Sequence, residues 1–335
     1  MAYSKALNEA TKRWVKANRE KITFVTEKGF NERLKECADR VGMSKQAQIV
    51  KLLSGLNGRY SKWVIWQDFI QMFAISIANA FPGPHREERE QKYLDIAKKY
   101  SKEELDKIAE MMALVVLGME ENPDQDFLGE LFMQLELGSN WHGQFFTPYN
   151  VCQMMARMSF SEEIFKAQVE EMGFVGVNDP ACGAGALLLS FANECRRKDF
   201  NFQHCCLFVA QDIDILAGMM CYIQLSLMGC AGYVIVDDTL SRPALFYDSR
   251  CLLPAGGSHV WTTPMMYSDT WQIRQIAARM DLMARRTGKA SEEVVKKLEP
   301  AKKEKPKKQA SVEMKQMPEP AETLPADESR QLTLF

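Results

Sequence analysis

Apolar runs alternate with helical patterns between residues 173 and 264, and this alternation constrains the fold more than any other feature of the chain. Short apolar runs bounded by turn residues predict buried strands, and the longer segments between them have helical periodicity. Strands are expected at 173–179, 206–214, 232–238 and 258–264, and helices at 185–197 and 215–229. Strands and helices that alternate at this spacing favour an α/β fold, with a parallel sheet and helices packed on its faces.

The turn between the first expected strand and its helix is rich in glycine, with the sequence NDPACGAGALLL at 178–189. Such a turn presents backbone N–H groups and a helix N-terminus at the carboxyl edge of the sheet, where nucleotide-like ligands bind. Leu188 stands where the dinucleotide fingerprint G-x-G-x-x-G requires its third glycine, so a nicotinamide-dependent dehydrogenase is disfavoured. Asp179 precedes the turn, and Asp212 ends the next strand. Two carboxylates favour a cationic nucleoside, and S-adenosylmethionine carries a sulfonium and an ammonium group.

Four short motifs carry a resemblance to a known family: GQFFTP (143–148), DPACGAG (179–185), AQDID (210–214) and DDTL (237–240). In this order they resemble the N6-adenine DNA methyltransferases, in particular the methylation subunit of type I restriction-modification systems and its shorter phage and mobile-element relatives. The resemblance covers roughly residues 60–265. It implies a Rossmann-like class I methyltransferase sheet that depends on S-adenosylmethionine and follows a helical layer. The sheet is expected to be truncated, because polar sequence begins soon after residue 286.

The resemblance also assigns cofactor-binding roles to individual residues. The positions that match the family's motifs are Phe146, Thr147, Pro148, Asp179, Ala181, Gly183, Gly185, Asp212, Ile213 and Asp238. The first three would line the methionine end, and Thr147 would also cap a helix that begins at Pro148. The next four would hold the amino-acid and ribose region. Asp212 would accept from the ribose hydroxyls, Ile213 would pack on the adenine ring, and Asp238 would accept from the adenine amine. The alternative is that these acids only end strands and solvate loops.

The expected catalytic step is methyl transfer to adenine N6, which requires a flipped-out base and acceptors for both amine hydrogens. The family places an Asn-Pro-Pro-Tyr or similar motif after its fourth strand, and this sequence has no such motif. The nearest candidate is VWTTPMMY at 260–267, with a hydroxyl from Thr262 or Thr263, then Pro264, and a stacking ring from Tyr267 or Trp261. Two interpretations follow. One is an adenine methylase with an altered site, with Thr263, Pro264 and Tyr267 as catalytic residues. The other is a DNA-associated cofactor-binding relative that has lost catalysis.

The N-terminal segment, 1–58, carries 12 Lys and Arg against 6 Asp and Glu, a net charge of +6 that fits contact with a polyanion. Within it, KITFVT (21–26) predicts a short strand, followed by a helix to Val41 and a second helix from Ser44 to Leu53. This pattern resembles the ribbon-helix-helix DNA-binding dimers, in which Lys21, Thr23 and Val25 would face double-stranded DNA and the chain would form a homodimer. The alternative is a helical hairpin docked on the main domain.

Helices are expected through residues 59–138, ahead of a methyltransferase-like domain at 139–286. The run from Trp63 to Phe81 is too apolar for a surface helix and predicts a buried one. A capping box, SKEE at 101–104, predicts the start of a second helix, and a third is expected over roughly 124–137.

The final segment, 287–335, has the composition of a disordered tail and ends in QLTLF. This ending resembles the peptide by which bacterial proteins dock on the replicative sliding clamp, with Gln331, Leu334 and Phe335 as the contact residues. A tether of this kind raises the local concentration of DNA. No apolar stretch reaches the length of a membrane helix and the N-terminus has no signal-peptide core, so a cytoplasmic protein is expected. The 9 cysteines have no metal-site spacing, so reduced thiols and no metal are expected.

Overall fold

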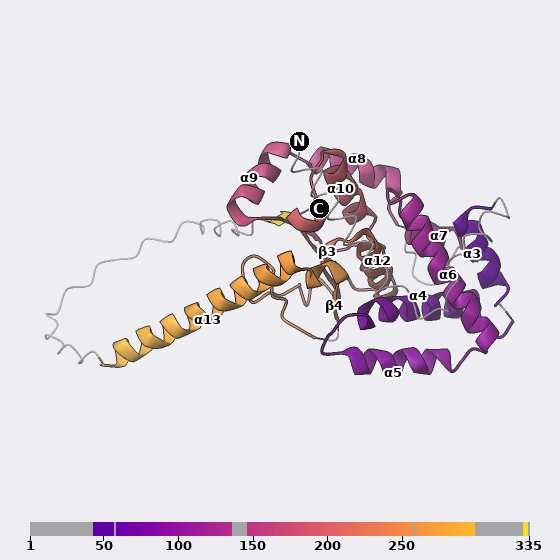
Figure 1. Ribbon diagram of the computed structural model, residues 1–335, viewed down its shortest axis with the longest axis horizontal. Helices are drawn as coiled ribbons and strands as arrows, with labels where there is room; N and C mark the ends of the chain where they lie inside the picture. Colours follow the sequence, from indigo (N-terminus) through magenta and orange to yellow (C-terminus); the bar gives the residue numbers. More distant parts are fainter. Residues whose placement is uncertain (1–42, 57, 136–145, 258, 299–330, 334–335) are drawn as a thin grey trace, which may run out of the picture.

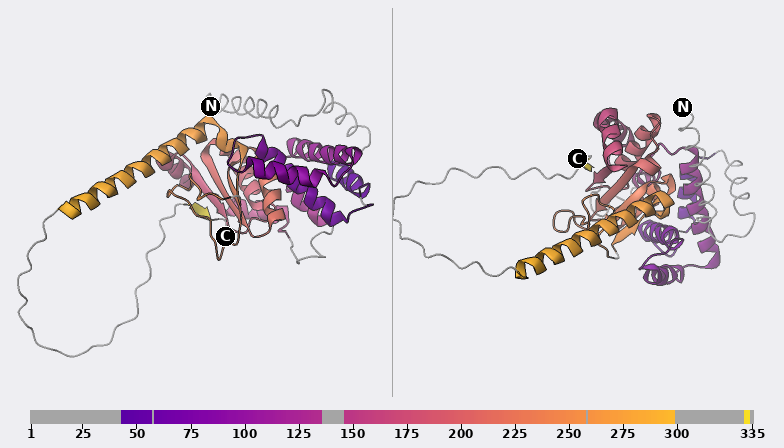
Figure 2. Two further views of the ribbon diagram at one scale, coloured as in Figure 1. Left: turned by 90° about the horizontal axis from the view of Figure 1, so that it is seen from below. Right: turned by 60° about the vertical axis from the view of Figure 1, so that its left-hand side comes forward.

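A five-stranded sheet with the order β4-β3-β2-β1-β5 lies at the centre of the protein. The structure is a computed structural model, which describes residues 43–56, 58–135, 146–257, 259–298 and 331–333. The strands are β1 (Val175–Asp179), β2 (Cys206–Asp212), β3 (Ala231–Val236), β4 (Val260–Thr262) and β5 (Gln331–Thr333). Figure 1 and Figure 2 show helices on both faces of this sheet. The predicted α/β class is therefore confirmed.

The three central strands run parallel and end at one edge of the sheet. Asp179 at the end of β1 lies beside Ala210 of β2, and Asp212 at the end of β2 lies beside Val236 of β3. Side chains alternate between the faces, so Val177 contributes to the core under one helix layer and Leu207 to a second core on the opposite face. The central strands are apolar because both of their faces are covered, and polar residues stand only at the carboxyl ends of β1 and β2.

One face of the sheet is covered by α8 (Tyr149–Ser159), α10 (Ala186–Arg197) and α12 (Ile215–Met228). Asp214 starts α12, where its Oδ1 accepts from the backbone N–H groups of Leu216 and Ala217. α12 is buried on nearly every side because it lies between the sheet and α4. The shorter helices α9 (Glu162–Met172) and α11 (Phe202–Cys205) precede β1 and β2.

The predicted helical layer packs outside this face and consists of α3 (Lys45–Ser54), α4 (Lys62–Asn79), α5 (Arg86–Ala97), α6 (Lys102–Glu121) and α7 (Phe127–Gln134). α4 is the predicted buried helix, with ten of its 18 residues buried. The predicted capping box at Ser101 and Glu104 is present and begins α6. Three sequence expectations for this layer are thus confirmed: the buried helix, the capping box and, as the shorter α7, the third helix.

α3 packs on α6 and joins this layer. It begins after Ser44, which caps it as predicted by accepting from the N–H of Ala47. Ile49 and Leu53 are fully buried, and burial of side chains of this size stabilises a fold by about 1.5–3 kcal/mol each. This contact fits the alternative of a docked helical hairpin. The expected strand at 21–26 and its three DNA-facing residues lie outside the described residues.

The opposite face of the sheet is covered by α13 (Asp269–Leu298), which follows a short 3-10 turn at Pro264–Tyr267. Trp271 is fully buried and its indole N–H donates to the carbonyl of Gln203 at 2.7 Å. Arg274 donates to the carbonyls of His204 and Gly173 and lies over the Trp271 ring. Beyond this attachment the second half of α13 extends away from the rest of the molecule (Figure 1).

β4 differs from the expectation of a parallel sheet, because it pairs with β3 in the antiparallel direction. A parallel return needs a crossover, which is usually a helix. The described part of the connection between β3 and β4 contains no helix, only loops and an isolated bridge between Phe246 and Pro254. The chain therefore turns back beside β3. In a doubly wound sheet of order 3-2-1-4-5-6, the fourth strand instead lies beside the first.

The edge of β1 is paired with β5, which runs parallel to it and sets Gln331 beside Gly176 and Thr333 beside Asn178. Gln331 belongs to the predicted clamp peptide, and its backbone is part of the sheet; Leu334 and Phe335 lie outside the described residues. In the part of the chain that the structure describes, no helix is both long and apolar enough to cross a membrane. The eight cysteines described are free thiols, and no group of metal-ligating side chains is found among the same residues.

Candidate functional site

The carboxyl edge of β1 and β2 holds two carboxylates that organise the glycine-rich turn between them. Asp179 is buried, and its Oδ1 accepts from the N–H of Ala181 at 3.1 Å. Asp212 Oδ2 accepts from the N–H of Gly183 at 2.8 Å, and its Oδ1 accepts from the N–H of Asp214 at 2.9 Å. Each carboxylate oxygen has a second lone pair, so both acids can hold the turn and still accept from a ligand.

Gly183 and Gly185 have backbone conformations that suit glycine, with φ values of +53° and +94°. A Cβ on Gly183 would meet the Phe146 ring at 3.0 Å, and a Cβ on Gly185 would meet Cys221 Sγ at 2.8 Å. Gly185 is also the residue from which α10 begins. The turn therefore needs glycine at both positions, for its left-handed backbone and for close contact with the side chains around it.

The electrostatics of this edge favour a cation. Burial raises the pKa of Asp179 to about 6; the hydrogen bond from Ala181 opposes this rise, and the negative charge of Asp212 adds to it. Burial also raises the pKa of Asp212. Two acids that are hard to ionise together gain from a positive charge placed beside them. A bound cation would therefore stabilise the ionised form of both carboxylates.

The loop after β3 completes the same edge. Thr239 Oγ1 donates to the carbonyl of Pro180 at 2.6 Å, which joins this loop to the glycine-rich turn. Asp238 accepts from the N–H of Leu240 and from the Ser241 hydroxyl, and these hydrogen bonds hold its pKa below the ordinary value. The predicted acceptor for the adenine amine is thus at the expected edge, as an ionised group.

An exposed aliphatic side chain stands among these polar groups. Ile213, directly after Asp212, is 71 % exposed. Its position leaves an apolar surface beside the Asp212 carboxylate. This arrangement suits a nucleoside, whose flat base can pack on the apolar surface while its ribose hydroxyls donate to the carboxylate. The structure therefore brings together Asp179, Ala181, Gly183, Gly185, Asp212, Ile213 and Asp238 at one edge of the sheet.

Phe146 reaches this site from the segment before α8. Its ring lies against Gly183 and is 5.3 Å from the Phe132 ring, centroid to centroid. The expected capping role of Thr147 is wrong: α8 begins at Tyr149, Pro148 is its N-cap residue, and no side chain caps this end. Pro148 therefore stands just before the helix and is not its first residue. Residues 143–145 of the GQFFTP motif lie outside the described residues.

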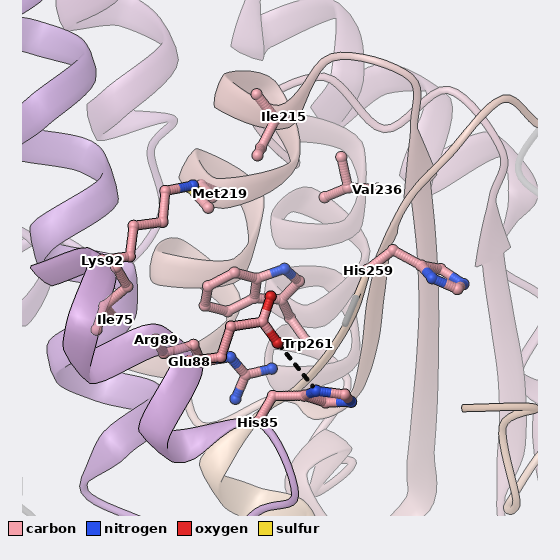
Figure 3. Close-up of a pocket in the computed structure, with 10 residues that line it drawn as sticks. All are labelled: Ile75, His85, Glu88, Arg89, Lys92, Ile215, Met219, Val236, His259 and Trp261. Atoms are coloured by element: carbon pink, nitrogen blue, oxygen red, sulfur yellow. Dashed lines mark ion pairs between the residues drawn. The ribbon is translucent and has the colours of Figure 1, made fainter. Parts of the chain in front are cut away.

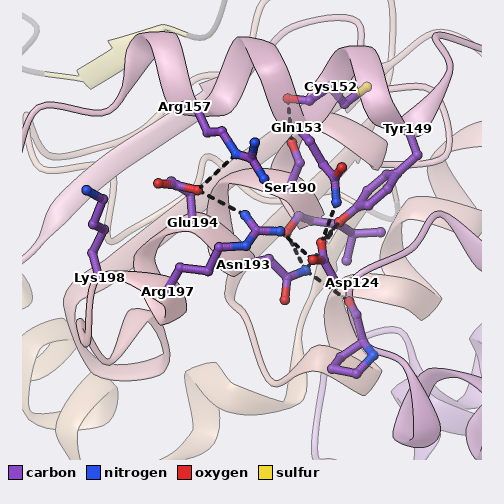
Figure 4. Close-up of polar contacts among 12 residues, drawn as sticks. Asp124, Tyr149, Cys152, Gln153, Arg157, Ser190, Asn193, Glu194, Arg197 and Lys198 are labelled. Atoms are coloured by element: carbon purple, nitrogen blue, oxygen red, sulfur yellow. Dashed lines mark hydrogen bonds and ion pairs between the residues drawn. The ribbon is translucent and has the colours of Figure 1, made fainter.

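A polar cluster fixes α8 to α10 and so holds Phe146 against the turn (Figure 4). Asp124 accepts from the Tyr149 hydroxyl at 2.9 Å and from Gln153 at 3.0 Å, and it forms an ion pair with Arg197. Burial opposes ionisation of Asp124, but these three donors outweigh it and lower the pKa. Asn193 of α10 donates to the Tyr149 hydroxyl and to the carbonyl of Pro123. The cluster therefore connects the helix after the FTP motif to the helix after the glycine-rich turn.

A second buried contact joins the helical layer to the glycine-rich turn through Gln224 of α12. Its Nε2 donates to Asp126 Oδ1 at 2.7 Å and to the carbonyl of Ala184 at 2.8 Å. Its Oε1 accepts from the N–H of Leu128 at 3.1 Å. Burial raises the pKa of Asp126 to about 6, although the hydrogen bonds from Gln224 and Gly129 lower it. The sequence analysis did not identify Gln224, although a glutamine inside a largely apolar helix was the available signal.

The predicted catalytic residues lie at the other edge of the sheet. β4 runs antiparallel, so Thr263 follows Thr262 toward the amino end of β3, where its N–H donates to the carbonyl of Gly232. Val236, at the carboxyl end of β3, is four positions after Gly232, which is about 13 Å along the strand. The assignment of these residues to the cofactor edge is therefore corrected.

The side chains of Thr263, Pro264 and Tyr267 form hydrogen bonds and packing contacts within the fold. Thr263 Oγ1 donates to the carbonyl of Cys230 and accepts from the N–H of Gly232. Pro264 is buried, and the Tyr267 ring stacks on Phe81 at 5.1 Å. Threonine, proline and tyrosine at this spacing thus serve packing between the sheet, α13 and the helical layer.

A pocket of about 250 Å³ lies between the helical layer and the β3–β4 edge (Figure 3). Arg89 forms its floor, 4.4 Å from the centre of the Trp261 ring, and donates to the carbonyl of Val260. The remaining lining residues are Ile75, His85, Glu88, Lys92, Ile215, Met219, Val236 and His259. Ile215 begins α12, three residues after Asp212, and Val236 ends β3, two residues before Asp238. The pocket therefore adjoins the carboxylate edge without including its acids.

The fold and this edge define an α/β protein whose candidate site is a glycine-rich turn framed by acids from adjacent strands. Residues 127–282 match the family model described as N-6 DNA Methylase. This segment, which extends from α7 to the attached part of α13, belongs to that family. It includes every cofactor-binding position expected from the sequence. No curated protein matches the chain.

Proposed function

We propose that this chain binds S-adenosylmethionine at the carboxyl edge of β1 and β2 and transfers its methyl group to adenine N6 in double-stranded DNA. The observation that carries the proposal is the pair of acids that hold the glycine-rich turn, the buried Asp179 and the half-buried Asp212. Membership of the matched segment in the N-6 DNA methylase family supports the reaction. The proposal places the reaction in the cytoplasm, on a Rossmann-like class I site.

Each residue at this edge has a task in the proposed complex. Asp179 provides negative charge for the ammonium or sulfonium of the cofactor, while Asp212 accepts hydrogen bonds from the ribose hydroxyls. Ile213 packs on the adenine ring, and Asp238 accepts from its amine. Phe146 closes the methionine end of the site. The bound cofactor supplies an electrophilic methyl group, and the chain orients it and compensates its charge.

A second candidate function is a DNA-associated module that binds the cofactor without transferring its methyl group. It is favoured by the position of Thr263, Pro264 and Tyr267, because a flipped base at the carboxyl edge would find none of these groups beside it. Methyl transfer needs acceptors for both amine hydrogens at the place where charge develops. The two candidates share the cofactor site and differ in that requirement.

Two measurements on the full chain separate the candidates. Calorimetry with S-adenosylmethionine tests the site, and radiolabelled methyl incorporation into unmethylated DNA of varied sequence tests the reaction. Binding with incorporation supports the methyltransferase, whereas binding without incorporation on any DNA supports the module. Absence of cofactor binding would reject both.

The C-terminal peptide is proposed to tether the protein to a sliding clamp. Gln331 would donate to the clamp, and Leu334 and Phe335 would fill an apolar pocket. The backbone of Gln331–Thr333 pairs with β1, so clamp docking would release β5 from the sheet edge. Deletion of residues 331–335 is expected to abolish clamp retention in a pull-down, with the full chain as the control. Retention of the truncated chain would refute the tether.

A further inference from the structure

Basic side chains gather at the pocket between α5 and the β3–β4 edge, outside the carboxylate site (Figure 3). Arg89 and Lys92 line it from α5, together with His85 at the start of that helix and His259 directly before β4. Among the described residues that line it, Glu88 is the single acid, and its Oε2 is paired with Nδ1 of His85 at 3.3 Å. The positive charge of Arg89 and Lys92 therefore exceeds the negative charge that faces it.

The guanidinium of Arg89 has little compensation within the fold. It lies 4.4 Å from the centre of the Trp261 ring, and its Nη2 donates to the carbonyl of Val260 at 3.3 Å, a long hydrogen bond. Its Nε has no hydrogen-bond partner among the described residues, and none of their carboxylates forms an ion pair with it. A half-buried cation without an anionic partner carries a desolvation cost that a bound anion would offset.

Two further features of α5 favour an anion at the same place. Lys92, three residues after Arg89 on the same face, extends from α5 toward Met219 of α12 (Figure 3). Partial burial lowers the pKa of Lys92, and the charge of Glu88 opposes this effect, so a second anion would further favour the charged amine. The helix also begins at this pocket, because its N-cap is His85 and no side chain caps it. The positive end of the helix dipole therefore adds to the charge of the two side chains.

The size of the pocket suits one anionic group of a larger molecule. Its volume of about 250 Å³ is below the range of roughly 300–1,000 Å³ for pockets that enclose a whole small ligand. The Trp261 ring is not free to stack on a base, because Arg89 covers it and the Tyr222 ring lies 5.3 Å from it, centroid to centroid. A guanidinium held against an aromatic ring can still present its N–H edge, which binds phosphate oxygens in pairs.

We propose that this pocket binds one phosphodiester group of double-stranded DNA, with Arg89 and Lys92 as the contact residues. The inference rests on the proposed function, which places adenine methylation at the adjoining carboxylate edge. The walls of the pocket include Ile215 and Val236, which lie next to that edge. A phosphate held there would fix the DNA strand beside the cofactor site. Such a contact positions the duplex and does not read its base sequence.

Fluorescence anisotropy of a labelled DNA duplex tests the contact on the full chain, over a series of salt concentrations. Arg89→Gln should raise the Kd about tenfold at low salt and lower the slope of log Kd against log salt by about one, the effect of one lost phosphate contact. Arg89→Lys keeps the charge and should keep most of that slope. The matched control is Lys98→Gln, which removes one charge from an exposed position of the same helix, about 14 Å along it from Arg89. This control should change neither the Kd nor the slope.

Lys92→Gln is a second variant, and its folding does not depend on the packing of Arg89 against Trp261. It should weaken DNA binding about threefold and lower the salt slope in the same direction. Calorimetry with S-adenosylmethionine should give the same Kd for every variant, because the pocket does not include the acids of the cofactor site. Unchanged DNA affinity in both Arg89→Gln and Lys92→Gln would overturn the phosphate contact and leave the cofactor site intact. Absence of cofactor binding to the natural sequence would reject the proposed function, and the DNA measurement would still decide the contact.

Inorganic phosphate distinguishes a phosphate of DNA from a free anion. Calorimetry with this ion is expected to show weak binding, because the ion lacks the other contacts of a duplex. Tight binding of inorganic phosphate that is lost in Arg89→Gln, without a change in DNA affinity, would assign the pocket to a free anion and overturn the proposal.

Discussion

Asp179 is the residue whose chemistry depends most on its surroundings. An aspartate that ends a strand is unremarkable in sequence, but here it is buried next to a second acid and its pKa is raised to about 6. The ionised form is therefore present near neutral pH and is lost within the range that can be tested without acid unfolding. This property makes the proposed role of Asp179 separable from a structural role.

Binding of a cationic cofactor is expected to weaken as the pH falls through 6. A proton on Asp179 removes the charge that the cofactor needs, so the dissociation constant should rise about tenfold between pH 7 and pH 5. Calorimetry with S-adenosylmethionine across this range measures the change. The Asp179→Asn variant should bind weakly at every pH in this range and show a flatter profile.

Stability provides the control for that variant. The pKa of Asp179 is higher in the folded chain than its ordinary value, so its contribution to stability is greatest below the ordinary pKa and falls as the pH rises through about 6. Asp179→Asn should therefore unfold at no lower urea concentration than the natural sequence at pH 7.5. Asp106→Asn, on an exposed part of α6, should change neither binding nor stability. Unchanged cofactor affinity in Asp179→Asn would contradict the assignment.

At the residue scale, motif matching located the acids and glycines of the turn, because strand ends and left-handed turns restrict which residues fit. It misplaced Thr147 and Thr263. Both are threonines next to a proline, and their hydrogen-bond partners are set by the position of the chain around them. Thr263, for example, is held by Cys230 and Gly232, about 30 residues away along the chain.

At the scale of elements, the glycine-rich turn and α10 form one unit. The turn reaches the helix through a left-handed residue at Gly185 and packs against Cys221 of α12. Its hydrogen bonds to Asp179 and Asp212 then orient the N–H groups of the turn. The element depends on backbone shape as much as on side-chain chemistry.

Gly185→Ala tests that dependence. An alanine there must adopt φ near +94° and place a methyl group 2.8 Å from Cys221 Sγ, so we expect a loss of about 2–4 kcal/mol in the free energy of unfolding and a large loss of cofactor affinity. Urea unfolding and calorimetry measure the two effects. Gly256→Ala is the matched control, since a Cβ at Gly256 meets nothing within 4 Å. A variant at Gly185 as stable as that control would show that the turn is more adaptable than inferred.

Helix and strand positions before residue 286 were predicted well, because the apolar runs there are long and their periods are clear. The expectation of a disordered tail from residue 287 was wrong for two stretches, because α13 continues to Leu298 and Gln331–Thr333 form β5. The direction of β4 was not predicted, because three residues of strand look the same in either direction. The length and conformation of the connection after β3 decide that direction. With β4 reversed, the VWTTPMMY segment runs from the carboxyl end of β3 toward its amino end, so its second half, from Thr263, lies at the amino edge of the sheet and packs beneath α13.

At the scale of the whole molecule, the helical layer and the sheet share buried polar contacts. Gln224 bonds to Asp126, to the N–H of Leu128 and to the carbonyl of Ala184, so it joins α7 and the glycine-rich turn through α12. The family match begins at residue 127, the first residue of α7, and therefore includes Leu128, Ala184 and Gln224 but not Asp126. The helical layer therefore supports the glycine-rich turn through Gln224 of α12.

Replacement of Gln224 by methionine is expected to weaken this support. Gln224→Met keeps the volume but removes one of the donors to the buried Asp126 carboxylate, which keeps the Gly129 N–H, and takes the Gln224 partner from the Leu128 N–H and the Ala184 carbonyl. We expect a loss of roughly 3 kcal/mol in the free energy of unfolding. Cofactor affinity should fall as well, because the Ala184 carbonyl belongs to the turn. Gln91→Met, on an exposed face of α5, should cost less than about 0.5 kcal/mol. Equal stabilities for the two variants, measured by urea unfolding, would show that the contact is dispensable.

The sequence by itself determined the α/β class, the glycine-rich turn and the acids on either side of it, because these depend on local periodicity and on short-range backbone geometry. Only the tertiary structure decided which edge of the sheet each motif reaches, how Gln224 joins the helical layer to the turn, and how Arg89 comes to lie beside Trp261. Those outcomes depend on contacts between residues far apart along the chain. Burial and partner geometry are properties of the folded arrangement, and no local pattern specifies them.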